Sequence, residues 1–224
     1  MLVVLEGLDG AGKSTQVRRF REYIAQTSGE PEYIHFPRMD TGVHGKLIAR
    51  FLKGDFGKVD QVHPQLVALL YAEDRRNALP EIRSALDAGR TVLLDRYVCS
   101  NIAYQCAKTH DKAEADTLRQ WILDTEYGDF GLPKPDLTIF LDVPMSFVEH
   151  NLSSQRQGRD RDYLQGGRDI HEEDLGLQAR VRDMYLNQAG LDPNFVVVDC
   201  SDGCGGIAPA DVIFQKIKDV YENR

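Results

Sequence analysis

Eight consecutive residues near the start of the chain, Gly7 to Ser14, have the types and the spacing of a loop that binds phosphate groups. They read GLDGAGKS, fit the pattern GxxxxGKS/T, and lie between an apolar run and a helical pattern. The glycines allow backbone N–H groups to turn inward around phosphates, and the N-terminus of the following helix adds partial positive charge. Lys13 would reach the β- and γ-phosphates of a nucleoside triphosphate, and the Ser14 hydroxyl would bind Mg²⁺. The residues expected to hold the triphosphate are Gly7, Leu8, Asp9, Gly10, Ala11, Gly12, Lys13, Ser14 and Thr15.

The loop defines the class of ligand but not the reaction, because GTPases, ATPases and kinases share it. A guanine-binding protein should also carry an NKxD-type sequence, and no asparagine of this chain is followed by lysine. A glycine-rich turn without function is the competing interpretation. It does not account for the position of the loop between a strand and a helix.

A second polar group, Asp95-Arg96-Tyr97, directly follows the apolar run Thr91–Leu94. Ligands of parallel sheets collect beyond the carboxyl ends of the strands, so Asp95 should lie near the loop, where a carboxylate helps to hold Mg²⁺. Arg96 should point its donors at the same region. An ion pair at the start of a helix is the structural alternative for both residues.

The elements that must position these groups alternate along the chain. The expected strands are Leu2–Leu5, Tyr33–Phe36, Thr91–Leu94, Leu137–Leu141 and Phe195–Val198. Helical spacing runs from Lys13 to Gly29, from about Leu47 to Leu52, from Val67 on to Gly89, around Trp121, and from about Pro209 to Tyr221. This alternation predicts an α/β fold in which helices cover both faces of a parallel sheet. The segment 155–174 has three glycines and many charges, so we expect a mobile surface loop there.

The composition limits the functions that are possible. The chain has 224 residues, 42% hydrophobic and 28% charged, with a net charge of −8, which is ordinary for one soluble domain and argues against a protein that coats nucleic acid. No apolar run approaches the ~20 residues needed to cross a bilayer, and the N-terminus does not read as a signal peptide. We expect a cytoplasmic protein with reduced cysteines. A metal site at Cys200 and Cys204 is the weaker alternative, because no second pair of ligands has suitable spacing.

Several motifs, taken in order, resemble the thymidylate kinase family. GLDGAGKST is followed by FPR, YAEDRRNALP, DRYVCSNIAYQ and LPKPDLTIFLDVP, so the match spans roughly residues 1–144, and a charged segment follows where that family has its lid. The resemblance implies a three-layer P-loop fold with a five-stranded parallel sheet and a mobile lid, in one domain over residues 1–224. It also implies a homodimer that uses Mg²⁺ and transfers the γ-phosphoryl group of ATP to dTMP, giving dTDP.

The resemblance also implies roles for individual residues. Asp9 would lie near the sugar of the acceptor, and Arg38 and Arg96 would bind its phosphate. Tyr71 would stack on thymine, and Arg75 would hydrogen-bond the base. Ser100, Asn101 and Tyr104 would form a wall that reads the base and crowds the 2′ position. The implied acceptor-binding residues are Asp9, Phe36, Arg38, Tyr71, Arg75, Arg96, Ser100, Asn101 and Tyr104.

Helical spacing agrees with the proposed reading of the base. Tyr71 and Arg75 are four residues apart and share a helix face, so one supplies a flat aromatic surface and the other an in-plane donor. Asn101 and Tyr104 are three apart and also share a face, and a tyrosine near the sugar would exclude a ribose. Core packing is the alternative for Tyr71, and a solvated helix face is the alternative for Arg75.

One departure from the family concerns the residue after the P-loop acid. Some members have arginine there, whereas this chain has Gly10, which resembles a type whose lid supplies the catalytic arginine. The candidates in the segment 155–174 are Arg156, Arg159, Arg161 and Arg168. Arg159 and Arg161 are the first choices and would act in catalysis beside Lys13, Asp9 and Arg96, whereas Arg156 would stack on the adenine of ATP. A plain exposed loop is the alternative.

Two other functions stay open at this stage. A kinase for another nucleoside monophosphate, or for a nucleoside, would share the loop but not the full set of base-reading residues. A regulatory nucleotide-binding protein would need no second phosphate site, and Arg38, Arg75 and Arg96 argue against it. The segment 199–209 either edges the adenine pocket or is a surface loop.

Overall fold

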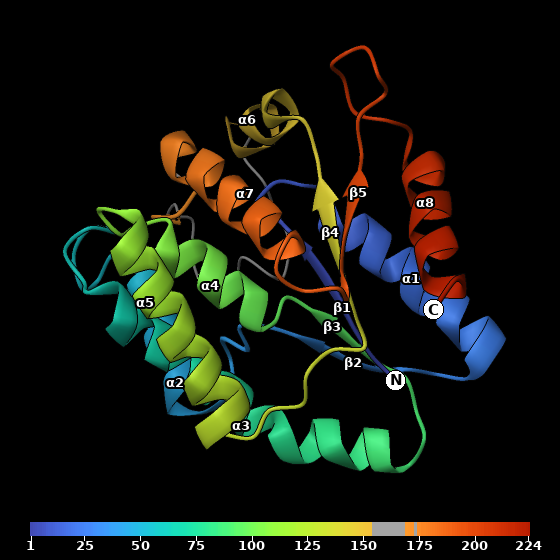
Figure 1. The fold of residues 1–224 in the computed structure, drawn as a ribbon, viewed down its shortest axis with the longest axis horizontal. Helices are drawn as coiled ribbons and strands as arrows, with labels where there is room; N and C mark the ends of the chain where they lie inside the picture. Colours follow the sequence, from blue (N-terminus) through green and yellow to red (C-terminus); the bar gives the residue numbers. More distant parts are fainter. Residues whose placement is uncertain (154–168, 173) are drawn as a thin grey trace.

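Five parallel strands form one sheet in the order β2-β3-β1-β4-β5 (Figure 1). The computed structural model describes residues 1–153, 169–172 and 174–224. The strands are β1 (Leu2–Gly7), β2 (Glu32–His35), β3 (Val92–Asp95), β4 (Leu137–Asp142) and β5 (Phe195–Asp199). All five strands expected from the sequence are confirmed, and their ends shift by at most two residues.

Helices connect the strands and cover both faces of the sheet. They are α1 (Lys13–Ser28), α2 (Gly42–Leu52), α3 (Pro64–Asp87), α4 (Val98–Cys106), α5 (Lys112–Leu123), α6 (Met145–Ser153), α7 (Leu175–Ala189) and α8 (Ala210–Glu222), with a π-helix over Asp124–Asp129. Figure 1 shows α1 and α8 on one side of the sheet and α3, α4, α5 and α7 on the other. The predicted α/β architecture is therefore confirmed. Within the described ranges, no helix is both long and apolar enough to span a bilayer.

Strand β1 has both faces buried, and its alternating side chains separate two cores. Val3 and Leu5 belong to the core that includes residues of α1 and α8, whereas Leu2 and Val4 pack with residues of α3, α4 and α5. A strand at the centre of a parallel sheet needs apolar side chains on both faces, which explains the unbroken run LVVL. The centre of the sheet is thus a rigid base for the loop that follows β1.

The helix α3 is one unbroken helix of 24 residues, although it contains Pro80. Its N-terminus is capped by His63, whose side chain accepts a hydrogen bond from the backbone N–H of Gln65, and Pro64 occupies the first turn, where its missing N–H is tolerated. The predicted helical spacing from Val67 to Gly89 is therefore confirmed. Tyr71 lies in the N-terminal half of this helix.

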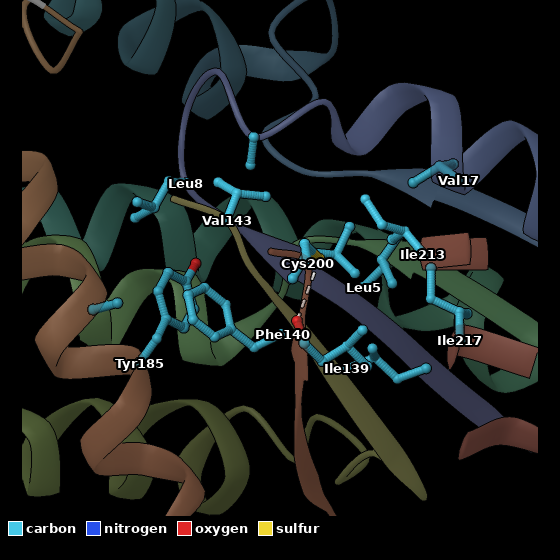
Figure 2. Packing of buried hydrophobic residues seen from close by; sticks show 14 of the residues in the cluster. Leu5, Leu8, Val17, Ile139, Phe140, Val143, Tyr185, Cys200, Ile213 and Ile217 are labelled. Atoms are coloured by element: carbon cyan, nitrogen blue, oxygen red, sulfur yellow. Dashed lines mark hydrogen bonds between the residues drawn. The ribbon is translucent and has the colours of Figure 1, made fainter. Parts of the chain in front are cut away.

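One aromatic contact is central to the packing of α7 on the sheet. Figure 2 shows Tyr185 of α7 against Phe140 of β4, and the two rings are stacked with centroids 4.5 Å apart. Phe140→Ala should lower the free energy of unfolding by about 3–5 kcal/mol, because it removes a fully buried ring and leaves a cavity. Urea denaturation measures the change. Leu191→Ala is the control, since this side chain is 62% exposed and its loss should change stability by about 0.5 kcal/mol or less. Equal effects of both substitutions would contradict the packing described here.

The end of the segment 155–174 is not a surface loop, so the prediction was wrong for its residues 169–172. Asp169 and His171 are only 6% and 4% exposed. The His171 ring packs against Tyr104 and Phe51, with centroids 5.3 Å and 5.6 Å away, and its Nε2 lies 2.9 Å from Nζ of Lys108. These long-range contacts bury polar residues that the local composition marks as solvated.

Candidate active site

A cavity of about 590 Å³ opens beyond the carboxyl ends of β1 and β3. It is lined by the loop Leu8–Ser14, by residues in and just after β2 and β3, by residues of α3 and α4, and by Asp169, His171 and Glu172. Segments that are far apart in the sequence therefore meet at the edge of the sheet where ligands of parallel α/β folds bind.

The P-loop has the conformation that its glycines allow. Gly10 and Gly12 have φ angles of 78° and 72°, which favour glycine, and Gly12 directly precedes α1. The side chain of Asn151 in α6 fixes the loop by donating a hydrogen bond to the carbonyl of Gly10 at 2.7 Å. Among the predicted triphosphate-binding residues, the seven from Leu8 to Ser14 line the cavity. Gly7, which ends β1, and Thr15, which is exposed on α1, flank it.

Lys13 and Asp95 face each other in the cavity. Nζ of Lys13 lies 3.3 Å from Oδ1 of Asp95, while Oδ2 of the same carboxylate lies 3.0 Å from Nδ1 of His35. Burial alone would raise the pKa of Asp95, but Lys13 and His35 outweigh it and hold that pKa below its usual range. Burial and the Arg96 cation lower the pKa of Lys13, and the two nearby carboxylates limit the change. The structure thus brings together the two predicted residues and adds His35, which β-sheet pairing places opposite Asp95.

Arg96 is held in an unusual backbone conformation by polar contacts. It is the one described non-glycine residue with a positive φ, of 69°. Its Nη2 donates to Oδ1 of Asp9 at 2.6 Å, and the hydroxyl of Tyr104 donates to Oδ2 of Asp9 at 2.8 Å. Strain of this kind persists only where the surroundings determine it, and it is frequent at functional sites. These contacts join three of the predicted residues into one cluster.

Asp9 is a carboxylate at neutral pH. Burial would raise its pKa, but the Arg96 guanidinium and the hydrogen bond from Tyr104 outweigh burial and bring that pKa to about 2. Gln178 of α7 donates a third hydrogen bond, from Nε2 to Oδ2 of Asp9 at 3.1 Å. A carboxylate held in this way can orient cations and hydroxyl groups but is a poor proton donor.

Ser100 has a hydroxyl that is largely engaged inside the protein. It donates to Oε2 of Glu6 at 2.5 Å and lies 2.8 Å from the hydroxyl of Tyr185. Glu6 is fully buried, and its Oε1 accepts hydrogen bonds from the backbone N–H groups of Tyr97 and Ser100 at the start of α4. Burial raises the pKa of Glu6. This network fixes the first turn of α4, directly after Arg96.

Tyr71, Arg75 and Asn101 line another part of the cavity. Tyr71 is half-buried and also packs against the apolar cluster of α2 and α3, so it serves the core as well as the cavity. Arg75 is 1% exposed, which excludes the solvated helix face as its environment. Its guanidinium forms a buried ion pair with Glu126 of the π-helix. The spacing of four residues therefore brings both side chains to the cavity, as expected.

Arg38 is placed differently from the other predicted residues. Phe36 lines the cavity, but Arg38 is not among the lining residues. Its backbone N–H donates to Oδ2 of Asp74 at 2.8 Å, Nε donates to Oδ1 at 3.1 Å, and Nη2 donates to the Asp74 carbonyl at 2.7 Å. The role expected for Arg38 stays a prediction.

Several predicted residues cannot be placed. Arg156, Arg159, Arg161 and Arg168 lie outside the described residues. The segment 199–209 contains a bridge between Ser201 and Ile207 and contributes no residue to the cavity lining. Its role at the adenine pocket also stays a prediction.

Sequence reasoning missed several residues of this site. His35 could have been found, because it is a polar residue at the end of an expected strand. Gln178, His171 and Glu126 had no local signal, since long-range packing alone brings them to Asp9, Tyr104 and Arg75.

The chain is similar along most of its length to proteins of one family. A family model described as thymidylate kinase matches residues 5–205. The thymidylate kinase of Mycobacterium tuberculosis (strain ATCC 25618 / H37Rv) is 32% identical and covers 95% of this chain and 99% of its own length. The probable thymidylate kinase of Thermococcus kodakarensis is 31% identical over 90% of both chains.

Solved structures agree with this similarity. A thymidylate kinase from Candida albicans has a TM-score of 0.71 at 27% identity, covering 99% of this chain and 91% of that chain. A thymidylate kinase from Ehrlichia chaffeensis has a TM-score of 0.66 at 21% identity, which supports the fold alone. Together with the ordered motifs and the cavity, these matches show that the chain belongs to the thymidylate kinase family.

Proposed function

We propose that this chain transfers the γ-phosphoryl group of ATP to dTMP, giving dTDP and ADP. The observation that carries the proposal is that a phosphate-binding loop and a wall of aromatic, guanidinium and amide side chains line the same cavity. A kinase needs both in one cavity, because the donor and acceptor phosphates must meet in line. Membership of the thymidylate kinase family supports dTMP as the acceptor.

Mg²⁺ belongs to the proposal, and the oxygen atoms near the P-loop fit this ion. Oδ1 of Asp95 is buried and pairs with the Lys13 ammonium at 3.3 Å, but it accepts no hydrogen bond within the described ranges. Ser14 lines the cavity as an exposed residue. Carboxylate and hydroxyl oxygens are donors that Mg²⁺ prefers. When bound with ATP, the ion would neutralise charge on the transferring phosphoryl group. Ser14 and Asp95 are the residues that would hold it.

The acceptor phosphate already carries an anionic oxygen, so the reaction needs no general base. The barrier is the repulsion between two polyanions, which positioned cations reduce. Lys13 would bind the donor phosphates and Arg96 the acceptor phosphate, while Asp9 would orient Arg96. Arg38 would contribute to the acceptor phosphate if its guanidinium leaves Asp74. Arg159 and Arg161 are proposed on the sequence alone to add a catalytic cation, and Arg156 to stack on adenine.

The base would bind between Tyr71 and the donors and acceptors of Arg75 and Asn101. Tyr71 offers a flat surface at the cavity. Tyr104 lies beside Asp9, where a hydroxyl-bearing ring would crowd a ribose 2′ oxygen more than a deoxyribose. Burial raises the pKa of Tyr104 well above its usual value, so the hydroxyl stays protonated and continues to donate to Asp9.

Turnover with a panel of acceptors tests the proposal. ADP formation from ATP and Mg²⁺ would be measured with dTMP, dUMP, UMP, dCMP and thymidine. We expect a strong preference for dTMP. Preference for another monophosphate would agree with the role of the P-loop but contradict the roles given to the residues that read the base. Absence of turnover with every acceptor would favour a regulatory nucleotide-binding protein.

Tyr71→Ala should weaken the binding of dTMP by roughly 5- to 150-fold, because stacking of a base on an aromatic ring is worth about 1–3 kcal/mol. Titration calorimetry with dTMP measures the change. Tyr71→Phe is the matched control, since it keeps the ring and should bind dTMP nearly as well as the wild type. Unchanged affinity in Tyr71→Ala would remove Tyr71 from the acceptor site.

The remaining implied features form part of the same proposal. We propose one domain over residues 1–224 with a lid at about 155–174, which works as a homodimer in the cytoplasm with ATP and dTMP as its ligands. It binds neither nucleic acid nor membrane. Light scattering of the purified protein would test the oligomeric state.

A further inference from the structure

We propose that Glu126 sets the choice of acceptor base by fixing which atoms of Arg75 and Asn101 face the ligand. This inference rests on the proposed function and assigns a positioning residue to it. Glu126 is completely buried and is not among the residues that line the cavity. It therefore acts through the two side chains that it contacts.

The carboxylate of Glu126 holds the side chains of both Arg75 and Asn101. Oε2 of Glu126 accepts a hydrogen bond from Nε of Arg75 at 2.5 Å, and Oε1 accepts from Nη2 of Arg75 at 2.7 Å. The same Oε1 accepts from Nδ2 of Asn101 at 2.8 Å. Charge-assisted bonds of this length are strong and directional, so the two side chains are fixed relative to each other.

These contacts leave Asn101 one possible orientation of its amide. Nδ2 of Asn101 donates to Glu126 and also to the carbonyl of Ala68 at 3.0 Å. Neither partner can donate a hydrogen bond, so the amide nitrogen must face them and Oδ1 must face away. Oδ1 is buried and has no hydrogen-bond partner among the described residues. It is the acceptor left for a ligand that carries an N–H group.

Arg75 is fixed so that it offers hydrogen-bond donors, whereas Asn101 offers an acceptor. Glu126 takes up the edge of the guanidinium formed by Nε and Nη2, and the described part of the chain gives Nη1 no hydrogen bond. Because the guanidinium is planar and rigid, the Nη1 donors have a set direction. Arg75 lines the cavity, so the wall offers a donor from Arg75 beside an acceptor from Asn101.

A donor beside an acceptor matches one class of pyrimidine. Thymine and uracil present a carbonyl next to a ring N–H, which pairs with this wall. Cytosine presents an amino group next to an unprotonated ring nitrogen, which reverses both partners and leaves buried polar atoms unpaired. Glu126 would therefore favour 4-oxo over 4-amino pyrimidine monophosphates.

The position of Glu126 follows from a local change of helix type. The helix α5 ends at Leu123, and the π-helix that follows has wider turns, with the N–H of Phe130 donating to the carbonyl of Thr125 at 2.9 Å. Within this π-helix Glu126 points inward, whereas Asp124 and Asp129 are exposed. Single π-turns of this kind are frequent at functional sites.

The test compares kcat/KM for dTMP and dCMP in the full-length enzyme with saturating ATP and Mg²⁺. Glu126→Gln keeps the shape of the side chain but has one acceptor oxygen, so it cannot hold Arg75 and Asn101 in the same way. We expect the ratio of dTMP to dCMP to fall about tenfold or more. Asp129→Asn, which removes an exposed carboxylate from the same π-helix, should leave the ratio unchanged. Glu126→Asp keeps the charge with a shorter reach and should give an intermediate ratio.

The outcomes separate this role from a merely structural one. A loss of activity that is equal for both acceptors, or a ratio within twofold of the wild type, would overturn the inference. If Glu126→Gln does not fold, Glu126→Asp decides by the same ratio. A wild-type enzyme that fails to phosphorylate dTMP would overturn the proposed function itself, whereas normal wild-type activity with an unchanged variant ratio would overturn the role of Glu126 alone.

Discussion

Replacing Lys13 by alanine should lower kcat about 10³-fold, equivalent to about 4 kcal/mol of transition-state stabilisation. Lys13 lines the cavity at the start of α1, and its ammonium group lies 3.3 Å from Asp95. Its positive charge is positioned before ATP binds, so little reorganisation is needed when charge develops on the phosphates. Initial-rate kinetics with ATP and dTMP measure the loss.

The control for this variant is a lysine that does not line the cavity. Lys112 is exposed at the start of α5, and Lys112→Ala should leave kcat unchanged. Binding of dTMP without ATP should also survive in Lys13→Ala, because Lys13 is assigned to the donor phosphates. A kcat for Lys13→Ala within tenfold of the wild type would contradict the assignment of Gly7–Ser14 as the ATP site.

Replacing Arg96 by alanine should lower kcat/KM for dTMP by about 10²–10³-fold, because it removes the cation assigned to the acceptor phosphate. The substitution also leaves the half-buried Asp9 without its guanidinium partner. The pKa of Asp9 then rises from about 2, because the Arg96 cation is the largest of the effects that oppose burial. The stability that a depressed carboxyl pKa supplies is present above the ordinary value and is lost as the pH falls, so the loss of unfolding free energy should be larger at pH 7 than at pH 4.

Arg96→Gly separates the guanidinium from the backbone strain. Both variants lack the cation and should lose activity equally, but glycine tolerates a φ of 69° without strain. We expect Arg96→Gly to be more stable than Arg96→Ala by about 1 kcal/mol, as measured by urea denaturation. Activity of either variant close to that of the wild type would show that Arg96 does not bind the acceptor phosphate.

The sheet and the P-loop could be predicted because each has a local cause. Short apolar runs such as LVVL have the length of a buried strand and are too short for a buried helix. The glycine spacing of the P-loop is required by the backbone conformation that surrounds the phosphates, so it is recognisable from the sequence alone. Helix α2 begins at Gly42, five residues before the expected start at Leu47. Its first turn contains two glycines and an exposed valine, so no apolar helical spacing marks it. The expected helices did not include α7, although Leu177, Val181 and Tyr185 are spaced four residues apart and pack in the core.

The site was predictable where one element supplies both partners. Tyr71 and Arg75 share a turn of α3, so their spacing alone brings them to the cavity. Glu126 and Arg75 are 51 residues apart, and the inward position of Glu126 depends on a π-helix that sequence periodicity does not reveal. Asp169 and His171 show the opposite case, because these two polar residues are buried, with the His171 ring against Tyr104.

The fate of the γ-phosphate of ATP tests the proposed transfer to dTMP most directly. The purified chain would be incubated with ATP labelled at its γ-phosphate, Mg²⁺ and dTMP, and the labelled products would be separated. We predict that the label appears in dTDP, in equal amount to the ADP formed, and that its appearance depends on dTMP. Label released mainly as inorganic phosphate, or transferred equally well to every monophosphate supplied, would contradict the proposed phosphoryl transfer to dTMP.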